Sequence, residues 1–390
     1  MPERLTILQV IPRMRAGGAE IGCLQVAEAQ IKAGHRALVA SEGGRLADDL
    51  EKLGGTHFEI AAATKNPIKL ITNAQALADI VRRENVDCIH ARSRAPAWSA
   101  LWAARKTGIA FVTTYHGEYR EQNKIKNLYN SVMARSDKVI AVSDNIGRLI
   151  QERYKTPLSR IAVIHRAYDP QRFDPARITP DLIAETRNKL GVPEGARILL
   201  LAGRISPNKA HNHLVEALGR LPPEQAKGFV LVFPGEIEKP DYAEGLKARA
   251  KTLGVEIRLP GHSENVALVM AASSALFNIS RTEGLPRVVI EAQAMGIPVV
   301  VSDSGPGREV ALTPPDTPIE QATGLRVPYA NPDALAAAIK SLFDMPSAAR
   351  RAMGARGMSH VRSRYTLEKM TGDTLKVYEE VVAANRARKR

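Results

Sequence analysis

The chain of 390 residues is longer than a single hydrophobic core usually serves, so we expect two domains. Its hydrophobic fraction of 44% and charged fraction of 25% are ordinary for a soluble globular protein, and no apolar run is long enough to span a bilayer. The formal net charge of +14 favours anionic partners such as phospholipid headgroups, phosphorylated sugars or nucleic acid, although a basic surface that serves only solubility would show the same surplus.

The two cysteines and the start of the chain bear on the compartment. Cys23 and Cys88 lie in apolar patterns and predict reduced core residues, as in a cytosolic protein. The start, MPERLTILQVIPRMRAGG, lacks the long apolar stretch and the small-residue cleavage site of a signal peptide. We therefore expect a cytoplasmic protein.

In the first half of the chain, short apolar or β-branched runs alternate with longer segments of helical character. The runs cover residues 5–11, 36–41, 86–91, 110–116, 138–143 and 161–165. Runs as continuous as these are typical of parallel strands buried on both faces, and the segments between them are long enough for crossover helices. This half predicts an α/β domain over residues 1–168.

The second half repeats that alternation after a stretch rich in Pro and Asp. Its apolar runs cover residues 198–203, 229–235, 255–261, 275–280 and 297–304. We expect a linker over residues 169–194, a second α/β domain over 195–365, and a C-terminal helix with a basic tail over 366–390 that packs back on the first domain. The architecture predicted is two doubly wound Rossmann-like domains facing across a cleft, with the ligand at the carboxyl ends of the strands.

The segment SRTEGLPRVVIEAQAMGIPVV, residues 280–300, places two glutamates on either side of a loop-to-helix junction. Glu283 lies in the loop, Pro286 fits the first turn of the helix, and Glu291 lies about a turn and a half inside it. The free N–H groups at the helix start favour a phosphate, and the two carboxylates can accept hydrogen bonds from paired hydroxyls. The spacing suits a nucleoside diphosphate sugar, although two glutamates taken alone are more often solvated acids.

Other segments add cations and glycines at strand ends. Arg204 ends a strand and Lys209 precedes a helix, so that together they could clamp a diphosphate. Gly17 and Gly18 permit close approach of a ligand to the backbone, without forming the GxGxxG dinucleotide motif. His116 stands at the carboxyl end of a strand. Each of these features alone has an ordinary structural explanation, so only their combination indicates a site.

Five motifs in chain order carry a family resemblance. They are GGAE (17–20), TTYHG (113–117), AGRxxxxK (202–209), TEGLPxxxxEA (282–292) and GIPVV (296–300). The set resembles family 4 retaining glycosyltransferases of the GT-B fold over nearly the whole chain. The segment HARSRAPAWSA (90–100) is also similar to lipopolysaccharide-core glycosyltransferases of Gram-negative bacteria.

The resemblance implies roles at the matching positions. Glu291 would bind the donor ribose, and Glu283 would lie beside the donor sugar. The base would rest near Pro234, Gly235 and the strand end at residues 258–262. Arg204 and Lys209 would hold the diphosphate, and His116 would contact the transferred sugar. The implied catalytic set is Glu283, His116, Arg204 and Lys209. The implied donor-binding set is Gly17, Gly18, Arg204, Lys209, Gly235, His262, Glu283, Gly284, Leu285, Pro286 and Glu291.

The acceptor is expected at the first domain, where residues 88–138 are rich in Lys and Arg. The expected acceptor-binding residues are Arg92, Arg94, Arg120, Lys124 and Arg166. Arg166 departs from the Asn-Gly pair that the family often has before its domain linker. These cations could dock on anionic headgroups or on a phosphorylated lipid-linked acceptor, whereas Trp98 and Trp102, spaced i, i+4, are more simply core residues.

We therefore expect an enzyme that transfers a hexosyl unit from a nucleotide sugar to a saccharide or lipid-linked acceptor, in lipopolysaccharide-core or related cell-envelope glycan synthesis. Because the chain has no DxD motif, we expect no bound metal ion, and we expect no cofactor. The sequence has no helix-turn-helix, zinc-ligand or aromatic RNA-binding motif, so we expect no nucleic acid partner. Peripheral contact with the inner face of the cytoplasmic membrane would fit the charge. The alternative is a nucleotide-sugar epimerase or hydrolase of the same architecture.

Overall fold

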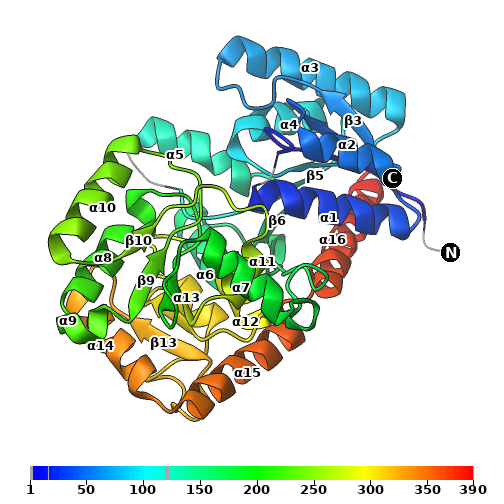
Figure 1. The fold of residues 1–390 in the computed structure, drawn as a ribbon. Helices are drawn as coiled ribbons and strands as arrows, with labels where there is room; N and C mark the ends of the chain where they lie inside the picture. Colours follow the sequence, from blue (N-terminus) through cyan, green and yellow to red (C-terminus); the bar gives the residue numbers. More distant parts are fainter. Residues whose placement is uncertain (1–2, 16, 120–122, 390) are drawn as a thin grey trace. The chain divides into compact units, whose positions relative to one another are not determined.

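The computed structural model describes residues 3–15, 17–119 and 123–389. The chain divides into two compact units, one formed by Met1–Arg166 with Leu367–Arg390 and the other by Ala167–Thr366. Each unit holds a parallel sheet with helices packed against it (Figure 1). The segment expected as a linker belongs to the second unit, where it forms the helix α7 (Pro180–Lys189).

The sheet of the first unit has the strand order β3-β2-β1-β4-β5-β6-β7, and neighbouring strands are parallel. The strands are β1 (Thr6–Val10), β2 (Arg36–Ser41), β3 (Thr56–Glu59), β4 (Cys88–Ala91), β5 (Ala110–Tyr115), β6 (Lys138–Ala141) and β7 (Ile161–Val163). The helices are α1 (Gly18–Lys32), α2 (Arg45–Lys52), α3 (Pro67–Glu84), α4 (Arg94–Thr107), α5 (Lys124–Asn130), α6 (Asp144–Tyr154) and α16 (Leu367–Ala387), with 3-10 turns η1 (Ser131–Ala134) and η2 (Leu158–Arg160). The central strands are buried from end to end, which explains their continuous apolar runs.

The C-terminal helix α16 packs against α1, β4 and β5 of the first unit. The hydroxyl of Tyr378 lies 2.6 Å from Nδ1 of His90, and Nε2 of His90 lies 2.7 Å from Oγ1 of Thr114. All three side chains are buried, and burial holds the pKa of His90 well below its ordinary value. This neutral, fully bonded histidine therefore fastens the end of the chain to the first sheet.

The sheet of the second unit has the order β10-β9-β8-β11-β12-β13 and is also parallel. Its strands are β8 (Arg197–Leu200), β9 (Phe229–Val232), β10 (Ile257–Arg258), β11 (Ala275–Asn278), β12 (Val299–Ser302) and β13 (Gly324–Val327). Besides α7, its helices are α8 (His211–Gly219), α9 (Pro223–Ala226), α10 (Pro240–Leu253), α11 (Val266–Ala271), α12 (Arg287–Ala294), α13 (Gly305–Val310), α14 (Pro332–Asp344) and α15 (Ser347–Arg364), with 3-10 turns η3 (Pro175–Arg177) and η4 (Pro207–Lys209).

Each strand order reverses once, between β1 and β4 in the first sheet and between β8 and β11 in the second. At such a switch point the two following loops leave in opposite directions and open a crevice at the carboxyl ends of the strands. The fold thus places residues 11–15 and 92–93 at one switch point, and loops 201–210 and 279–286 at the other. Within the described ranges, no helix is both long enough and apolar enough to cross a membrane.

Candidate functional site

An ion pair joins the two loops at the switch point of the second unit. Nζ of Lys209, in the loop after β8, lies 2.5 Å from Oε1 of Glu283, in the loop after β11. The side chains are only 15% and 19% exposed, so water screens the pair weakly. The structure therefore brings together two residues that the motifs placed 74 positions apart.

Asn208 holds these two loops in register. Its backbone carbonyl accepts from the N–H of Arg281 at 2.8 Å, and its amide donates to the carbonyl of Thr282 at 3.1 Å. The hydroxyl of Thr282 donates back to Oδ1 of Asn208 at 3.0 Å. The positions of Lys209 and Glu283 on either side of this contact are therefore fixed before any ligand arrives.

The carboxyl group of Glu283 is held ionised. Burial by itself raises its pKa, but the charge and hydrogen bond of Lys209, with a further contribution from Asn278, outweigh burial and bring the pKa below its ordinary value. Nδ2 of Asn278 lies 3.4 Å from Oε1 of Glu283. Glu283 is consequently a hydrogen-bond acceptor and not a proton donor at neutral pH.

Arg204 and Gly235 lie on the neighbouring loops of the same edge. The guanidinium of Arg204 is exposed, and its Nη1 lies 3.2 Å from Oε2 of Glu238. A Cβ atom on Gly235 would lie 1.9 Å from the carbonyl oxygen of Gly203, so the two loops touch through backbone alone. The aliphatic stem of Lys209 runs beside Gly203, because a Cβ there would lie 3.3 Å from Cε of Lys209.

Helix α12 begins at Arg287, with Pro286 as its N-cap, one residue later than the first-turn position that the sequence predicts for the proline. Glu291 is buried one turn inside the helix, and its Oε1 lies 3.0 Å from Nη2 of Arg287. Gly284 and Leu285 are buried in the loop before the helix, whereas His262 is exposed in the loop after β10. The helix start, Glu283 and Lys209 therefore share the same edge of the sheet.

His211 is a polar residue at this edge that lies outside all five sequence motifs. It is fully buried at the start of α8, edge-on to Phe233 with ring centroids 4.9 Å apart. Neither ring nitrogen has a hydrogen-bond partner among the residues described. Burial, reinforced by the charge of Lys209, lowers its pKa from the ordinary 6.5 to about 3, so His211 is neutral at physiological pH.

At the switch point of the first unit, Gly17 and Gly18 stand where α1 begins. The N–H of Gly17 donates to Oε2 of Glu20 at 2.6 Å, and Nη2 of Arg166 donates to the carbonyl oxygen of Gly18. Arg166 is only 6% exposed and lies against the first turns of α1, since a Cβ atom on Gly22 would lie 2.5 Å from its Nη2. Arg166 therefore fixes the start of α1 from inside.

Two further basic side chains follow β4 and β5. Arg92 is 4% exposed, and its Nη1 donates to Oε1 of Gln9 at 2.6 Å. Nε2 of His116 is buried and has no partner in the described part of the chain. Burial, with the positive charges of Arg166 and Arg92, holds the pKa of His116 well below its ordinary value.

Arg94, Lys124 and Arg120 are the remaining cations of the expected acceptor set. Arg94 donates to Oδ1 of Asn130 at 2.7 Å and stacks over the ring of Tyr119, 4.0 Å from the centroid. Lys124 is exposed at the start of α5. Arg120 lies outside the described residues.

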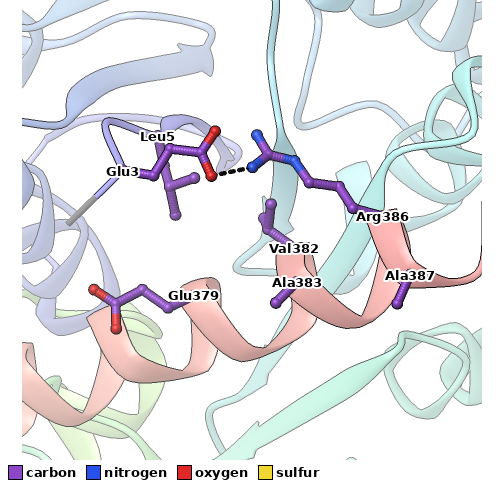
Figure 2. Close-up of a pocket in the computed structure, with 7 residues that line it drawn as sticks. All are labelled: Glu3, Leu5, Glu379, Val382, Ala383, Arg386 and Ala387. Carbon is purple, nitrogen blue, oxygen red and sulfur yellow. Dashed lines mark hydrogen bonds and ion pairs between the residues drawn. The ribbon is translucent and has the colours of Figure 1, made fainter. Parts of the chain in front are cut away.

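A cavity of about 410 Å³ in the first unit lies on the opposite edge of the sheet (Figure 2). Leu5 directly precedes β1, and the ion pair between Glu3 and Arg386 spans the hollow beside α16. Ligands of open α/β sheets bind at the carboxyl ends of the strands, whereas this cavity lies at the amino end of β1. We therefore do not count it as part of the candidate site.

Two family models cover most of the chain. Residues 16–172 match the one described as Glycosyltransferase Family 4, and residues 183–360 match the one described as Glycosyl transferases group 1. The chain belongs to the family 4 glycosyltransferases. The crystal structure of a glycosyltransferase from Rickettsia africae ESF-5 shares 31% identity with this glycosyltransferase, with a TM-score of 0.86 over 97% of this chain and 99% of that one.

Two relatives with more specific names match this chain over a smaller share of their length than the Rickettsia glycosyltransferase does. The D-inositol 3-phosphate glycosyltransferase of Streptomyces avermitilis is 31% identical over 271 residues, which are 66% of this chain and 55% of the relative. This chain thus spans about half of the length of that relative. The GDP-mannose-dependent monoacylated alpha-(1-6)-phosphatidylinositol monomannoside mannosyltransferase of Corynebacterium glutamicum is 26% identical over 312 residues, 77% of this chain and 78% of the relative.

The comparisons confirm the family and the fold that the motifs predict, namely two Rossmann-like units of the GT-B type. They give no support to the alternative of an epimerase or hydrolase. The narrower likeness to lipopolysaccharide-core enzymes stays a prediction, since the curated relatives reported above are named for inositol compounds.

Proposed function

We propose that this glycosyltransferase moves a hexosyl unit from a nucleoside diphosphate sugar to a hydroxyl of a saccharide or lipid-linked acceptor, with retention of the anomeric configuration and without a bound metal ion. The observation that carries the proposal is the Lys209–Glu283 pair at the switch point of the second unit. It presents a cation for phosphate and an ionised carboxylate for sugar hydroxyls a few ångströms apart. The name of the Corynebacterium relative, GDP-mannose-dependent, supports a nucleotide-sugar donor.

The leaving group determines where positive charge is needed. The bond between the anomeric carbon and the diphosphate oxygen breaks, a bond to the acceptor oxygen forms, and the acceptor hydroxyl proton passes to the departing phosphate on the same face. Lys209 donates one of its three N–H groups to Glu283, and the other two can donate to phosphate oxygens. Arg204, whose partner Glu238 is exposed, can turn to the same diphosphate, and the N–H groups at the start of α12 add to the positive potential.

Two carboxylates then hold the hydroxyls on either side of the phosphates. We assign Glu283 to the transferred sugar and Glu291 to the ribose, with Gly284, Leu285 and Pro286 lining the phosphates. We assign Gly235 and His262, on the loops after β9 and β10, to the base. In the first unit we assign Gly17 and Gly18 to the close approach of backbone and substrate, and the neutral ring of His116 to a hydroxyl of the sugar.

The acceptor side of the proposal rests on exposed side chains of α3, α4 and α5 in the first unit, a set that we call the α3–α5 patch. Large apolar side chains lie exposed on it, with Ile68 72% and Ile125 81% exposed. Its apolar members are Ile68, Ile71, Trp102, Ile125 and Leu128. Helix α4 connects α3 to α5 through two hydrogen bonds. The hydroxyl of Ser99 donates to the carbonyl of Leu70 on α3 at 2.8 Å, and the indole N–H of Trp98 donates to the carbonyl of Tyr129 at the end of α5 at 3.2 Å.

Basic side chains accompany these apolar residues. The exposed cations on the three helices and the turn before α3 include Lys65, Lys69, Arg105, Lys106 and Lys124. Apolar side chains surrounded by lysines suit the interface of an anionic bilayer, where the aliphatic tips enter the headgroup region and the ammonium groups meet phosphate. We therefore place this enzyme in peripheral contact with the inner face of the cytoplasmic membrane, acting on a cell-envelope glycan such as the lipopolysaccharide core.

The donor is tested with a thermal-shift panel of UDP-glucose, UDP-galactose, GDP-mannose and ADP-glucose. One donor should raise Tm well above the others, because a ligand that binds only the folded state stabilises it. Incubation of that labelled donor with candidate acceptors should yield a glycoside whose anomeric configuration, determined by NMR, equals that of the donor, with and without EDTA. Free sugar or an epimerised donor as the only product, with every acceptor, would refute the proposal.

A further inference from the structure

A second cavity of the first unit, about 650 Å³ in volume, lies at the amino ends of β6 and β7. Residues 135–138 lead into β6, Ser159 and Arg160 lead into β7, and the C-terminal part of α16 closes the third side. Because the strands are parallel, this edge of the sheet is opposite to the one at which His116 follows β5. The cavity is therefore separate from the residues that we assign to the proposed reaction.

Charged side chains dominate the lining of this cavity. Four of them are cations and two are carboxylates, namely Arg135, Lys138, Arg160 and Arg388, with Asp137 and Glu380. We call these six side chains the amino-edge cluster. The cluster carries a surplus of two positive charges at neutral pH.

Two of the four cations are paired with the two carboxylates. Nη2 of Arg388 lies 2.9 Å from Oδ1 of Asp137, and Nζ of Lys138 lies 3.3 Å from Oε2 of Glu380. Asp137 is also bound through its second oxygen, since Oδ2 accepts from the N–H of Phe111 at 2.9 Å. These two ion pairs tie α16 to the start of β6, so they have a structural purpose of their own.

The other two cations, Arg135 and Arg160, have only neutral partners among the residues that the structure describes. Nε of Arg135 donates to Oγ of Ser131 at 3.1 Å, and its guanidinium lies 5.5 Å from the ring centroid of Trp98. Nη2 of Arg160 donates to two backbone carbonyls in the turn before β6. These contacts orient both guanidinium groups without neutralising them, and each group has further N–H donors.

We propose that the amino-edge cluster binds a phosphomonoester carried by a sugar or polyol with free hydroxyl groups. A phosphomonoester carries a charge of about −1.5 to −2 at pH 7 and offers three acceptor oxygens, which matches the surplus of two cations. The exposed hydroxyl of Ser159 can donate to the same phosphate. The carboxylate of Glu380, whose side chain is 62% exposed, can accept hydrogen bonds from hydroxyls of the carrier.

The charge and the size of the cavity distinguish this ligand from other anions. A phosphodiester, such as the headgroup of a phospholipid, carries a single negative charge and would balance only one of the two arginines. Pockets for small organic ligands have volumes of about 300–1,000 Å³. The cavity lies within this range at about 650 Å³ and has room for a carrier as well as a phosphate.

The test is calorimetric titration of the full chain with glycerol 3-phosphate at constant ionic strength. We expect saturable binding that is about tenfold weaker in Arg160→Gln, because a charge-assisted hydrogen bond is lost. Dimethyl phosphate, which has one charge and no hydroxyl group, should bind the wild type about tenfold more weakly than glycerol 3-phosphate does. Arg82→Gln, which removes an exposed charge from α3 of the same unit, is the control and should bind like the wild type.

Glu380→Ala gives a prediction of opposite sign. The change removes one carboxylate and frees Lys138, so inorganic phosphate should bind several-fold more tightly than it binds the wild type. The advantage of glycerol 3-phosphate over inorganic phosphate should shrink in this variant, because the carrier hydroxyls lose an acceptor. Tighter binding is a result that a damaged fold would not produce.

Several results would overturn the proposal. They are wild-type affinity in Arg160→Gln, weaker phosphate binding in Glu380→Ala, equal affinity for dimethyl phosphate and glycerol 3-phosphate, or no binding of glycerol 3-phosphate at all. If circular dichroism shows that Arg160→Gln is unfolded, Arg135→Gln replaces it, with the same loss expected and wild-type affinity as the contrary result.

One further variant keeps this test apart from the proposed function. Lys209→Ala should bind glycerol 3-phosphate like the wild type, because Lys209 belongs to the other unit. Loss of glycerol 3-phosphate binding in a folded Lys209→Ala chain would assign the signal to the donor site and refute the amino-edge cluster as its source. Failure of every nucleotide sugar to bind would refute the donor assignment and leave this titration interpretable.

Discussion

Nζ of Lys209 and Oε1 of Glu283 lie 2.5 Å apart, although 74 positions separate the two residues in the chain. Their loops follow β8 and β11, the neighbouring strands at which the order of the second sheet reverses. The reversal explains why a lysine and a glutamate from distant motifs meet, and why they meet at an edge where helix N-termini also point. The pair is therefore the structural centre of the donor assignment.

Lys209→Ala should reduce kcat/KM by about 100-fold or more, because a preorganised cation beside the leaving diphosphate acts mainly in the transition state. Initial-rate kinetics with the donor from the thermal-shift panel provide the measurement. Lys227→Ala, which removes an exposed lysine of the same unit, should leave the rate unchanged. A Lys209→Ala enzyme with wild-type kcat/KM would remove Lys209 from the reaction.

Glu283→Gln keeps the shape of the side chain and removes its charge, so it should also lower kcat/KM by about 100-fold, while the fold survives. The double variant with Lys209→Ala separates two roles of Glu283. If Glu283 acts chiefly by positioning Lys209, the double variant should be no slower than Lys209→Ala alone. Fully additive losses would show instead that Glu283 contacts the sugar independently of the lysine.

Glu291→Gln should raise KM for the donor about tenfold with little change in kcat, because contacts to the ribose are equally strong in the ground state and the transition state. Arg287, the partner of Glu291 at 3.0 Å, stays in place in this variant, and the helix should keep its position. Steady-state kinetics with varied donor concentration give both parameters. A fall in kcat at unchanged KM would contradict the ribose assignment.

The α3–α5 patch predicts binding to anionic vesicles. Flotation with phosphatidylglycerol vesicles should recover the wild type, and Ile68→Ser with Ile71→Ser should weaken binding by about tenfold or more, because two exposed aliphatic side chains no longer enter the interface. Leu158→Ser, which changes an exposed apolar residue elsewhere in the first unit, is the matched control. Equal recovery on phosphatidylcholine vesicles, or equal binding by the double variant, would refute the membrane contact.

Several features of this fold are predictable from short stretches of sequence. Continuous apolar runs identify the central strands to within a few residues, because a parallel strand covered on both faces has no polar side. The edge strands β3 (THFE) and β13 (GLRV) escape the same criterion, since edge positions tolerate polar and charged side chains. The motifs themselves indicate Lys209 and Glu283, but only the strand order explains the contact between them.

The burial of individual side chains could not be predicted from the sequence. Arg92 belongs to a basic stretch that we expect to meet an anionic acceptor, yet its side chain is almost completely buried directly after β4 and donates to Gln9 on β1. Trp102, at core-like helical spacing, is exposed, whereas Trp98 spends its N–H on the carbonyl of Tyr129. Residue type and spacing describe what a side chain prefers, and the packing of non-adjacent elements decides whether it is covered.

Acid should destabilise the second unit through His211. Its pKa falls from 6.5 in the unfolded chain to about 3 in the folded protein, first through burial and then through the charge of Lys209. Below pH 6.5 His211 is protonated in the unfolded chain but stays neutral in the folded protein. The free energy of unfolding therefore falls as the pH falls, by about 2 kcal/mol between pH 7 and pH 5. Urea titrations at the two pH values measure this difference.

The positions of the two tryptophans allow the unfolding of the first unit to be followed separately. Both tryptophans lie in the first unit, so their fluorescence follows that unit, whereas far-ultraviolet circular dichroism follows both units. His211→Phe should remove about 2 kcal/mol of pH dependence from the dichroism transition and leave the fluorescence transition unchanged. His262→Gln, which replaces an exposed ring of the second unit, should keep the wild-type difference. An unaltered pH dependence in His211→Phe would show that the ring of His211 takes up a proton in the folded protein as readily as in the unfolded chain.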